Sequence, residues 1–63
     1  MKLQREAPNR PYAVCRGRFD RWHIYEHTIN GWHWIASFRY DMMTEQYKDD
    51  LNDAFERGTK WLT

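Results

Sequence analysis

The stretch HTINGWHWI, residues 27–35, decides the fold because an Asn-Gly pair separates two runs of strand-forming residues. Asn30-Gly31 is the strongest short-range signal for a two-residue hairpin, since a type I′ turn needs positive φ at both central positions. The pairs expected across this turn are Ile29 with Trp32, His27 with Trp34, Tyr25 with Ala36 and His23 with Phe38. The sequence therefore predicts an antiparallel hairpin with a definite register.

This register divides the side chains of the hairpin between two faces. One face is heavily aromatic, and it has a small residue, Ala36, between Trp34 and Phe38. We expect a helix to cover this aromatic face, because the small side chain lets a helix approach and Trp34 then forms core. The other, mixed face would stay open to solvent, and it carries Trp22, Ile24, Glu26, His33, Ile35, Ser37 and Arg39.

Two further segments precede the hairpin. Residues 1–11 are polar, contain both prolines of the chain and lack periodicity, so we expect a flexible N-terminal arm. A strand over Tyr12–Arg16 is expected to pair with the start of the hairpin through a turn at Gly17, with its register left open. Residues 12–63 would then form a single small domain.

The C-terminal segment from Thr44 onwards has helical periodicity, and Thr44 is a typical N-cap residue. Gly58 either lies inside the apolar stripe or ends the helix. The stripe consists of Tyr47, Leu51, Ala54, Phe55, Gly58, Trp61 and Leu62, and the ion pairs expected on the wet side are Asp53–Arg57 and Glu56–Lys60. The predicted fold class is therefore α+β, a three-stranded antiparallel sheet with one C-terminal helix packed on one face.

A chain of 63 residues with a single cysteine, Cys15, has room for only a small core and cannot form an internal disulfide. Four Trp, four Tyr and three Phe supply large buried areas instead. The first residues lack the apolar stretch of a secretion signal, and no segment is long enough to span a membrane. We therefore expect a soluble, cytoplasmic protein that does not act at a membrane.

The histidines, the cysteine and the acids do not follow the spacing of a metal site or a catalytic site. His23 and His27 would lie about 13 Å apart along a strand, at ~3.3 Å per residue, and His33 would face the other way. Cys15 paired with a histidine lacks the orienting group and the cleft that a nucleophile needs. We expect no metal, no cofactor and no catalytic residue, and hence a protein that is not an enzyme.

Charge is unevenly distributed along the chain, although the net charge is only +1. Residues 1–39 hold seven Lys or Arg and three Asp or Glu, which gives +4. Residues 40–63 hold three and six of these, which gives −3. Such a split can mark an interaction surface, or it can reflect a strand region followed by a helix region.

The expected open face has the composition of a protein-binding surface, with an aromatic anchor, aliphatic neighbours and a rim of arginine. The candidate partner-binding residues are Trp22, Ile35, Arg39, Arg18, Arg16, His33 and Ile24. Our first expectation is a small non-enzymatic binding module that recognises a larger protein and inhibits or redirects it. Small regulators encoded by phages and mobile elements are often of this kind, which is an analogy and not a motif.

A DNA- or RNA-binding domain that uses the same basic sheet face is the alternative. The order RGRFDRWHIYEH, WHWIASFRY and helix resembles, in architecture, the sheet-reading DNA-binding domains of some plant transcription factors and integrases. That resemblance implies a sheet face in the major groove, with Arg16, Arg18, Trp22 and Arg39 in comparable places. It covers about fifty residues without a diagnostic motif, so no family is assigned, and Glu26 and Asp20 would repel phosphate.

Self-association is compatible with either function. A homodimer through Trp22, Ile24 and Ile35, or through the edge of the last strand, would compensate for a small core.

Overall fold

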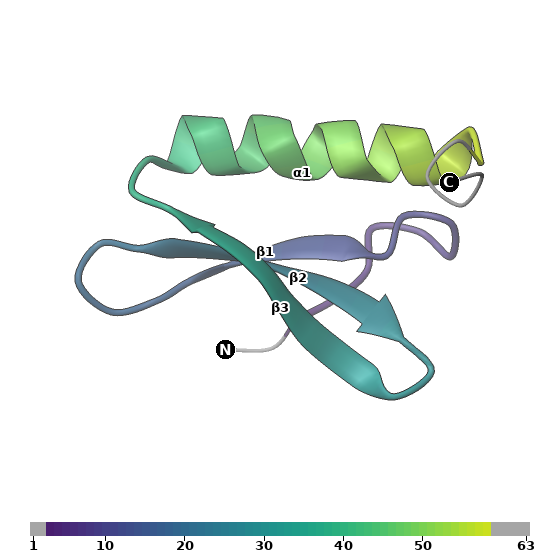
Figure 1. Ribbon diagram of the computed structural model, residues 1–63, viewed down its shortest axis with the longest axis horizontal. Coiled ribbons are helices and arrows are strands. Elements are labelled where there is room, and N and C mark those ends of the chain that lie inside the picture. The colour runs from purple at the N-terminus through teal and green to yellow at the C-terminus, as the bar shows by residue number, and fades with distance from the viewer. Residues whose placement is uncertain (1–2, 59–63) are drawn as a thin grey trace.

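The computed structural model describes residues 3–58, and it confirms the predicted α+β fold. Three antiparallel strands form a sheet in the order β1-β2-β3, and one helix lies along one side of that sheet (Figure 1). The strands are β1 (Tyr12–Arg16), β2 (Trp22–Thr28) and β3 (Gly31–Phe38), and the helix is α1 (Asp41–Glu56). The first strand has the bounds predicted for it. Within residues 3–58, no helix is long and apolar enough to cross a membrane.

The β2–β3 turn differs by one residue from the predicted turn. Thr28 pairs with Gly31, so the turn residues are Ile29 and Asn30 instead of Asn30 and Gly31. Within residues 3–58, the only non-glycine residues with positive φ are Phe19 and Asp20, so Asn30 does not adopt the type I′ conformation. The Thr28 hydroxyl instead accepts a hydrogen bond from the Asn30 backbone N–H at 3.1 Å and donates one to the Gly31 carbonyl at 3.2 Å.

A β-bulge in β3 changes the register a second time. Tyr25 pairs with Trp34 but Ile24 pairs with Ala36, which leaves Ile35 as an extra residue opposite the Ile24–Tyr25 step. Side chains alternate across a strand, so the extra residue reverses the alternation along β3. As a result, Trp34 comes to lie on the same face as Ser37.

The bulge reverses the predicted assignment of faces for β2, whereas the turn shift moves each cross-strand partner by two residues and keeps the side chains on their faces. The helix covers the face that carries Ile24, which has no exposed surface, and the ring of Phe38 meets that of Tyr47 in α1 edge-to-face at 5.4 Å. Ala36 and Phe38 therefore lie beneath the helix as predicted. The prediction was wrong for Ile24, which is buried, and for Trp34, which is 59% exposed.

The helix begins earlier than predicted. Tyr40 is its N-cap residue, and Thr44 lies within the first turn, where its hydroxyl donates to the Tyr40 carbonyl at 2.7 Å. The helix ends at Glu56, and Gly58 follows with a φ of 76°, which selects the expectation that Gly58 ends the helix. The predicted contributions of Lys60, Trp61 and Leu62 lie outside the described residues.

The deepest side of the helix is polar. Thr44, Lys48 and Asn52 are its buried residues, one turn apart, whereas Tyr47 of the predicted stripe is exposed and Leu51 and Phe55 are half-buried. The Asn52 side chain accepts a hydrogen bond from the Tyr12 backbone N–H at 2.9 Å and donates one to the Tyr12 carbonyl at 3.2 Å. A polar side chain is needed here because β1 is an edge strand, whose outward peptide groups must find partners.

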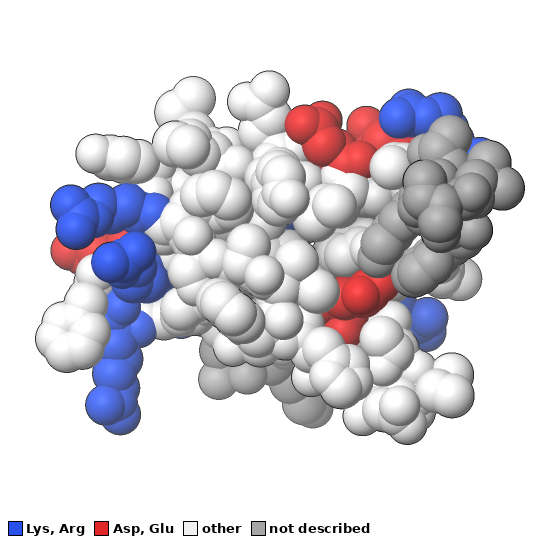
Figure 2. All heavy atoms as spheres, in the orientation of Figure 1, with Lys and Arg blue, Asp and Glu red and all other residues white. Residues whose placement is uncertain are grey.

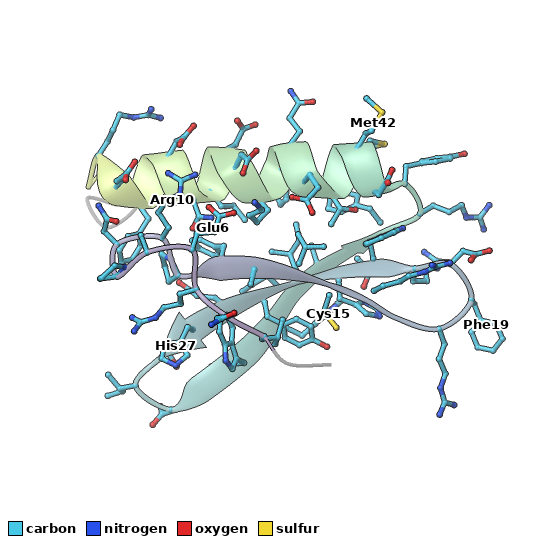
Figure 3. All side chains as sticks on the ribbon, turned by 180° about the vertical axis from the view of Figure 1, so that it is seen from behind. Glu6, Arg10, Cys15, Phe19, His27 and Met42 are labelled. Carbon is cyan, nitrogen blue, oxygen red and sulfur yellow. The ribbon has the colours of Figure 1, made fainter. Side chains whose placement is uncertain are left out.

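An ion-pair belt of Glu6, Arg10, Lys48, Asp53 and Glu56 joins the N-terminal segment to α1 (Figure 3). Arg10 binds Asp53 at 3.1 Å, in place of the predicted Asp53–Arg57 pair, and Glu56 at 3.0 Å. The predicted Glu56–Lys60 pair lies outside the described residues. Hydrogen bonds from Lys48 and Arg10 lower the pKa of Glu6. The flexibility expected for residues 1–11 stays a prediction.

Candidate functional site

The open face is the side of the sheet away from α1, and it is formed by six ring-bearing or hydroxyl side chains. Its members come from two neighbouring strands, and contacts among them place them on one side. They are His23, Tyr25, His27, Trp32, Trp34 and Ser37. Figure 3 shows His27, together with Cys15 of β1, on this side of the sheet.

The rings are arranged in cross-strand pairs. Tyr25 lies opposite Trp34, and His27 lies opposite Trp32 with their ring centres 4.8 Å apart in an edge-to-face arrangement. His23 continues the series along β2, with its ring centre 6.3 Å from that of Tyr25. The result is a continuous ring surface across two strands, of which Trp34 is the exposed member.

Ser37 connects the two ends of this ring surface. The indole N–H of Trp34 donates to the Ser37 hydroxyl at 3.0 Å, and the same oxygen lies 2.6 Å from Nδ1 of His23. An indole nitrogen can only donate, so the Ser37 hydroxyl accepts from Trp34, and the same hydroxyl also bonds Nδ1 of His23. Trp34 therefore has its one polar group satisfied within the protein and offers an apolar ring to solvent.

Gly17 makes room for the imidazole at the end of this chain of contacts. A Cβ atom at this glycine would overlap the ring of His23. Gly17 is therefore needed for close approach of a side chain and not for a positive φ.

No carboxylate of the described sheet belongs to the open face. Glu26 is the only acidic residue within the three strands, and it lies on the helix side, where the Tyr12 hydroxyl donates to it at 3.0 Å. Burial raises the pKa of Glu26, while the nearby His33 acts in the opposite direction. The open face is therefore free of the negative charge that the sequence analysis placed on it.

Arginines gather at one end of the sheet, which Figure 2 shows at the left beside the β1–β2 loop. This basic end consists of Arg16, Arg18, Arg21 and Arg39. Arg16 pairs with Asp20 at 3.2 Å and lies over the ring of Trp22, 5.6 Å from its centre. Asp20 therefore has its charge partly compensated within the loop.

The β1–β2 loop also presents an exposed aromatic ring. Phe19 is 91% exposed, projects from the loop (Figure 3) and has a φ of 58°. A bulky side chain is rarely found in this left-handed region, because its Cβ crowds the following carbonyl. Phe19 and Asp20, both with positive φ, are the central residues of a turn closed by the Arg21 N–H, which donates to the Arg18 carbonyl at 3.2 Å.

The structure divides the predicted site residues into three groups. Ile24 and Trp22 lie on the helix side, which corrects their placement on an open surface, and the reason is the bulge at Ile35, which puts them on the face of Ala36 and Phe38. Ile35 is the bulged residue, and His33 lies opposite Glu26 towards the hairpin tip, which diverges from α1 (Figure 1). Arg16, Arg18 and Arg39 lie together at the basic end. Their roles in binding stay predictions.

Sequence reasoning missed the open face itself. Tyr25, His27, Trp32 and Trp34 were placed on the face expected beneath the helix, with Trp34 as core and Trp32 near the rim, because the bulge in β3 was not foreseen. Their aromatic clustering was visible in the sequence, but the bulge that turns Trp34 outwards has no glycine or proline to indicate it.

The described residues offer little support for bond-making chemistry. Within residues 3–58, no group of three or more His, Cys, Asp and Glu residues is placed to hold a metal ion. Ser37 and His23 have the spacing of a nucleophile and its base, but they lie on the sheet surface. Three hollows, of about 240, 430 and 210 Å³, are each lined in part by residues of α1.

Comparison with protein-family models, with curated proteins and with solved structures finds no match for this chain. The residues of the open face and the basic end therefore carry the functional argument alone.

Proposed function

We propose that this protein binds single-stranded nucleic acid, with bases stacked on the open face and phosphates held at the basic end. The observation that carries the proposal is the exposed ring of Trp34 on a face that has no carboxylate within the described strands. Proteins that bind single strands combine ring surfaces with a positively charged track, and each stacked base contributes about 1–3 kcal/mol.

Trp34 suits this role because its orientation is already set. The Ser37 hydroxyl holds the indole N–H, so a stacking base does not have to satisfy a buried donor. Tyr25, directly across the strand pair, extends the platform. A stacking surface of this kind accepts every base, so we expect weak sequence preference.

The observed register favours nucleic acid over a protein partner. The expectation of a protein partner depended on Trp22 and Ile24 as surface anchors, and both lie on the helix side. The objection to nucleic acid depended on Glu26 and Asp20. Glu26 is on the helix side, and Asp20 is paired with Arg16.

Fluorescence anisotropy with labelled oligothymidine and oligouridine tests the proposal. We expect Trp34→Ala to weaken binding roughly 5- to 150-fold, which corresponds to the loss of about 1–3 kcal/mol of stacking. Two or three phosphate contacts would give a slope of log K against log salt of about −1.4 to −2.1. The matched control is Met42→Ala, which removes another exposed apolar side chain, on the side of α1 away from the sheet (Figure 3).

Two results would overturn the proposal. One is an absence of measurable binding to either single strand at low salt, and the other is equal binding by the wild type and Trp34→Ala. Capture of one protein from a nuclease-treated lysate, lost on Trp34→Ala, would instead identify the open face as a protein-binding surface.

A further inference from the structure

The described core is small for a domain that folds alone. Only three hydrophobic side chains within residues 3–58 are buried, those of Tyr12, Ala13 and Ile24. Domains near 60 residues bury only about 60% of the surface of the unfolded chain, and they often need an additional source of stability such as oligomerisation. The large apolar side chains that remain exposed therefore need an explanation.

Three of these side chains, those of Tyr40 at the N-cap and of Met43 and Tyr47 in α1, form a row along one flank of the helix. Together with Asp50 we name this row the α1 seam. The spacing of three, four and three residues places its members on one side of the helix. Tyr40 is 63%, Met43 54% and Tyr47 43% exposed. A hollow of about 210 Å³ follows the seam, lined by Phe38, Met43, Gln46, Tyr47 and Asp50.

The charges at the two ends of the seam are opposite. Arg39 precedes the helix at one end and Asp50 lies at the other, and neither forms an ion pair within residues 3–58. Most other helix acids already have partners, because Glu45 and Asp49 bind Lys48 while Asp53 and Glu56 bind Arg10. At the seam itself, the charge free to meet a partner is therefore one base and one acid, separated by apolar side chains.

We propose that the occupant of the α1 seam is a second copy of this chain, packed antiparallel about a two-fold axis near Met43 and Tyr47. In an antiparallel pair, Arg39 of each copy meets Asp50 of the other, so both charges are satisfied twice. A parallel pair would place like charges opposite one another. The second copy leaves the open face free, because that face lies on the other side of the sheet (Figure 1). It engages Arg39 of the basic end, which leaves Arg16, Arg18 and Arg21 for phosphate.

The middle of the seam is tested by sedimentation velocity on two neighbouring variants. The wild type should sediment as a dimer that dissociates on dilution, and its melting temperature should rise with concentration. Met43→Glu introduces a charge into the seam and should give a monomer. Met42→Glu makes the same change about 100° further round the helix, outside the seam and its hollow, and should leave the dimer intact. A wild type that is monomeric at every concentration, or a dimer unaffected by Met43→Glu, would overturn the proposal.

The antiparallel geometry is tested by charge reversal. Arg39→Glu and Asp50→Arg should each give a monomer, because each places like charges opposite one another twice. An equimolar mixture of the two variants should form a heterodimer, detected by native mass spectrometry, because both contacts again join opposite charges. Circular dichroism of each variant checks that the monomers are folded. Two folded variants that fail to pair with each other would refute the antiparallel arrangement.

Discussion

The two faces of the sheet differ in a way that reverses the usual expectation. The face beneath α1 joins the helix through polar as well as apolar contacts, since Asn52 bonds the backbone of Tyr12, and Lys48 is buried beside it in the ion-pair belt. The face left open carries most of the aromatic rings of the hairpin. The comparison teaches that the polar side of a helix can be its buried side when it covers an edge strand, whose free peptide groups require partners.

Among the substitutions that test this difference between the two faces, the largest loss of stability is expected at Ile24. Its side chain has no exposed surface, so Ile24→Ala should lower the free energy of unfolding by about 2–5 kcal/mol. Ile29 at the hairpin tip is fully exposed, and the matched Ile29→Ala should change stability by less than about 0.5 kcal/mol. Chemical denaturation of both variants measures the difference. Equal effects would mean that the helix does not cover the Ile24 face.

The second-largest loss of stability is expected at Asn52. Asn52→Leu keeps a side chain of similar size but leaves the N–H and C=O of Tyr12 without their partner, which costs ~1–3 kcal/mol for a buried group. Asn52→Asp retains an oxygen that can accept from the Tyr12 N–H, so at a given pH it should lower stability less than Asn52→Leu does. Denaturation midpoints, with amide exchange at Tyr12, test this order. A more stable Asn52→Leu variant would contradict the role of a polar helix face.

Glu6 and Glu26 are expected to have smaller effects on stability, and these effects should depend on pH in opposite directions. The pKa of Glu6 is lowered in the folded state, so its contribution to stability is present above its ordinary value of 4.5 and is lost as the pH falls through the folded pKa. Glu6→Gln should therefore be less stable than the wild type at neutral pH, and this difference should shrink in acid. Thermal melts from neutral to acidic pH, compared with those of the wild type, measure it.

Glu26 should show the opposite dependence. Burial raises its pKa, so its charge opposes folding above the folded pKa, and that opposition disappears as the pH falls. Glu26→Gln should therefore gain stability relative to the wild type at neutral pH, while the Tyr12 hydroxyl can still donate to an amide oxygen. The same direction of change in both variants would show that the two carboxyls do not differ as their surroundings suggest.

The elements could be predicted from the sequence, but the faces could not. Strand-forming residues, Gly17 and Gly58 indicated where strands and helix begin or end, because these signals are local. The turn depended on a hydrogen bond from the Thr28 hydroxyl, but the faces depended on the extra residue at Ile35. Side chains alternate with a period of two, so one inserted residue moves the side chains that follow it to the opposite face. The candidate surface therefore changed although its strands did not.

By itself, the sequence determined the three strands, the helix, their antiparallel order and the aromatic composition of the hairpin, because periodicity and turn residues act over a few neighbours. Only the tertiary structure decided which rings face solvent and why Asn52 and Lys48 are buried. Those outcomes join residues distant in the chain, such as Tyr12 with Asn52 and Glu6 with Lys48. Contacts of this kind form because the helix must satisfy the free edge of β1, a requirement that exists only once the sheet is built.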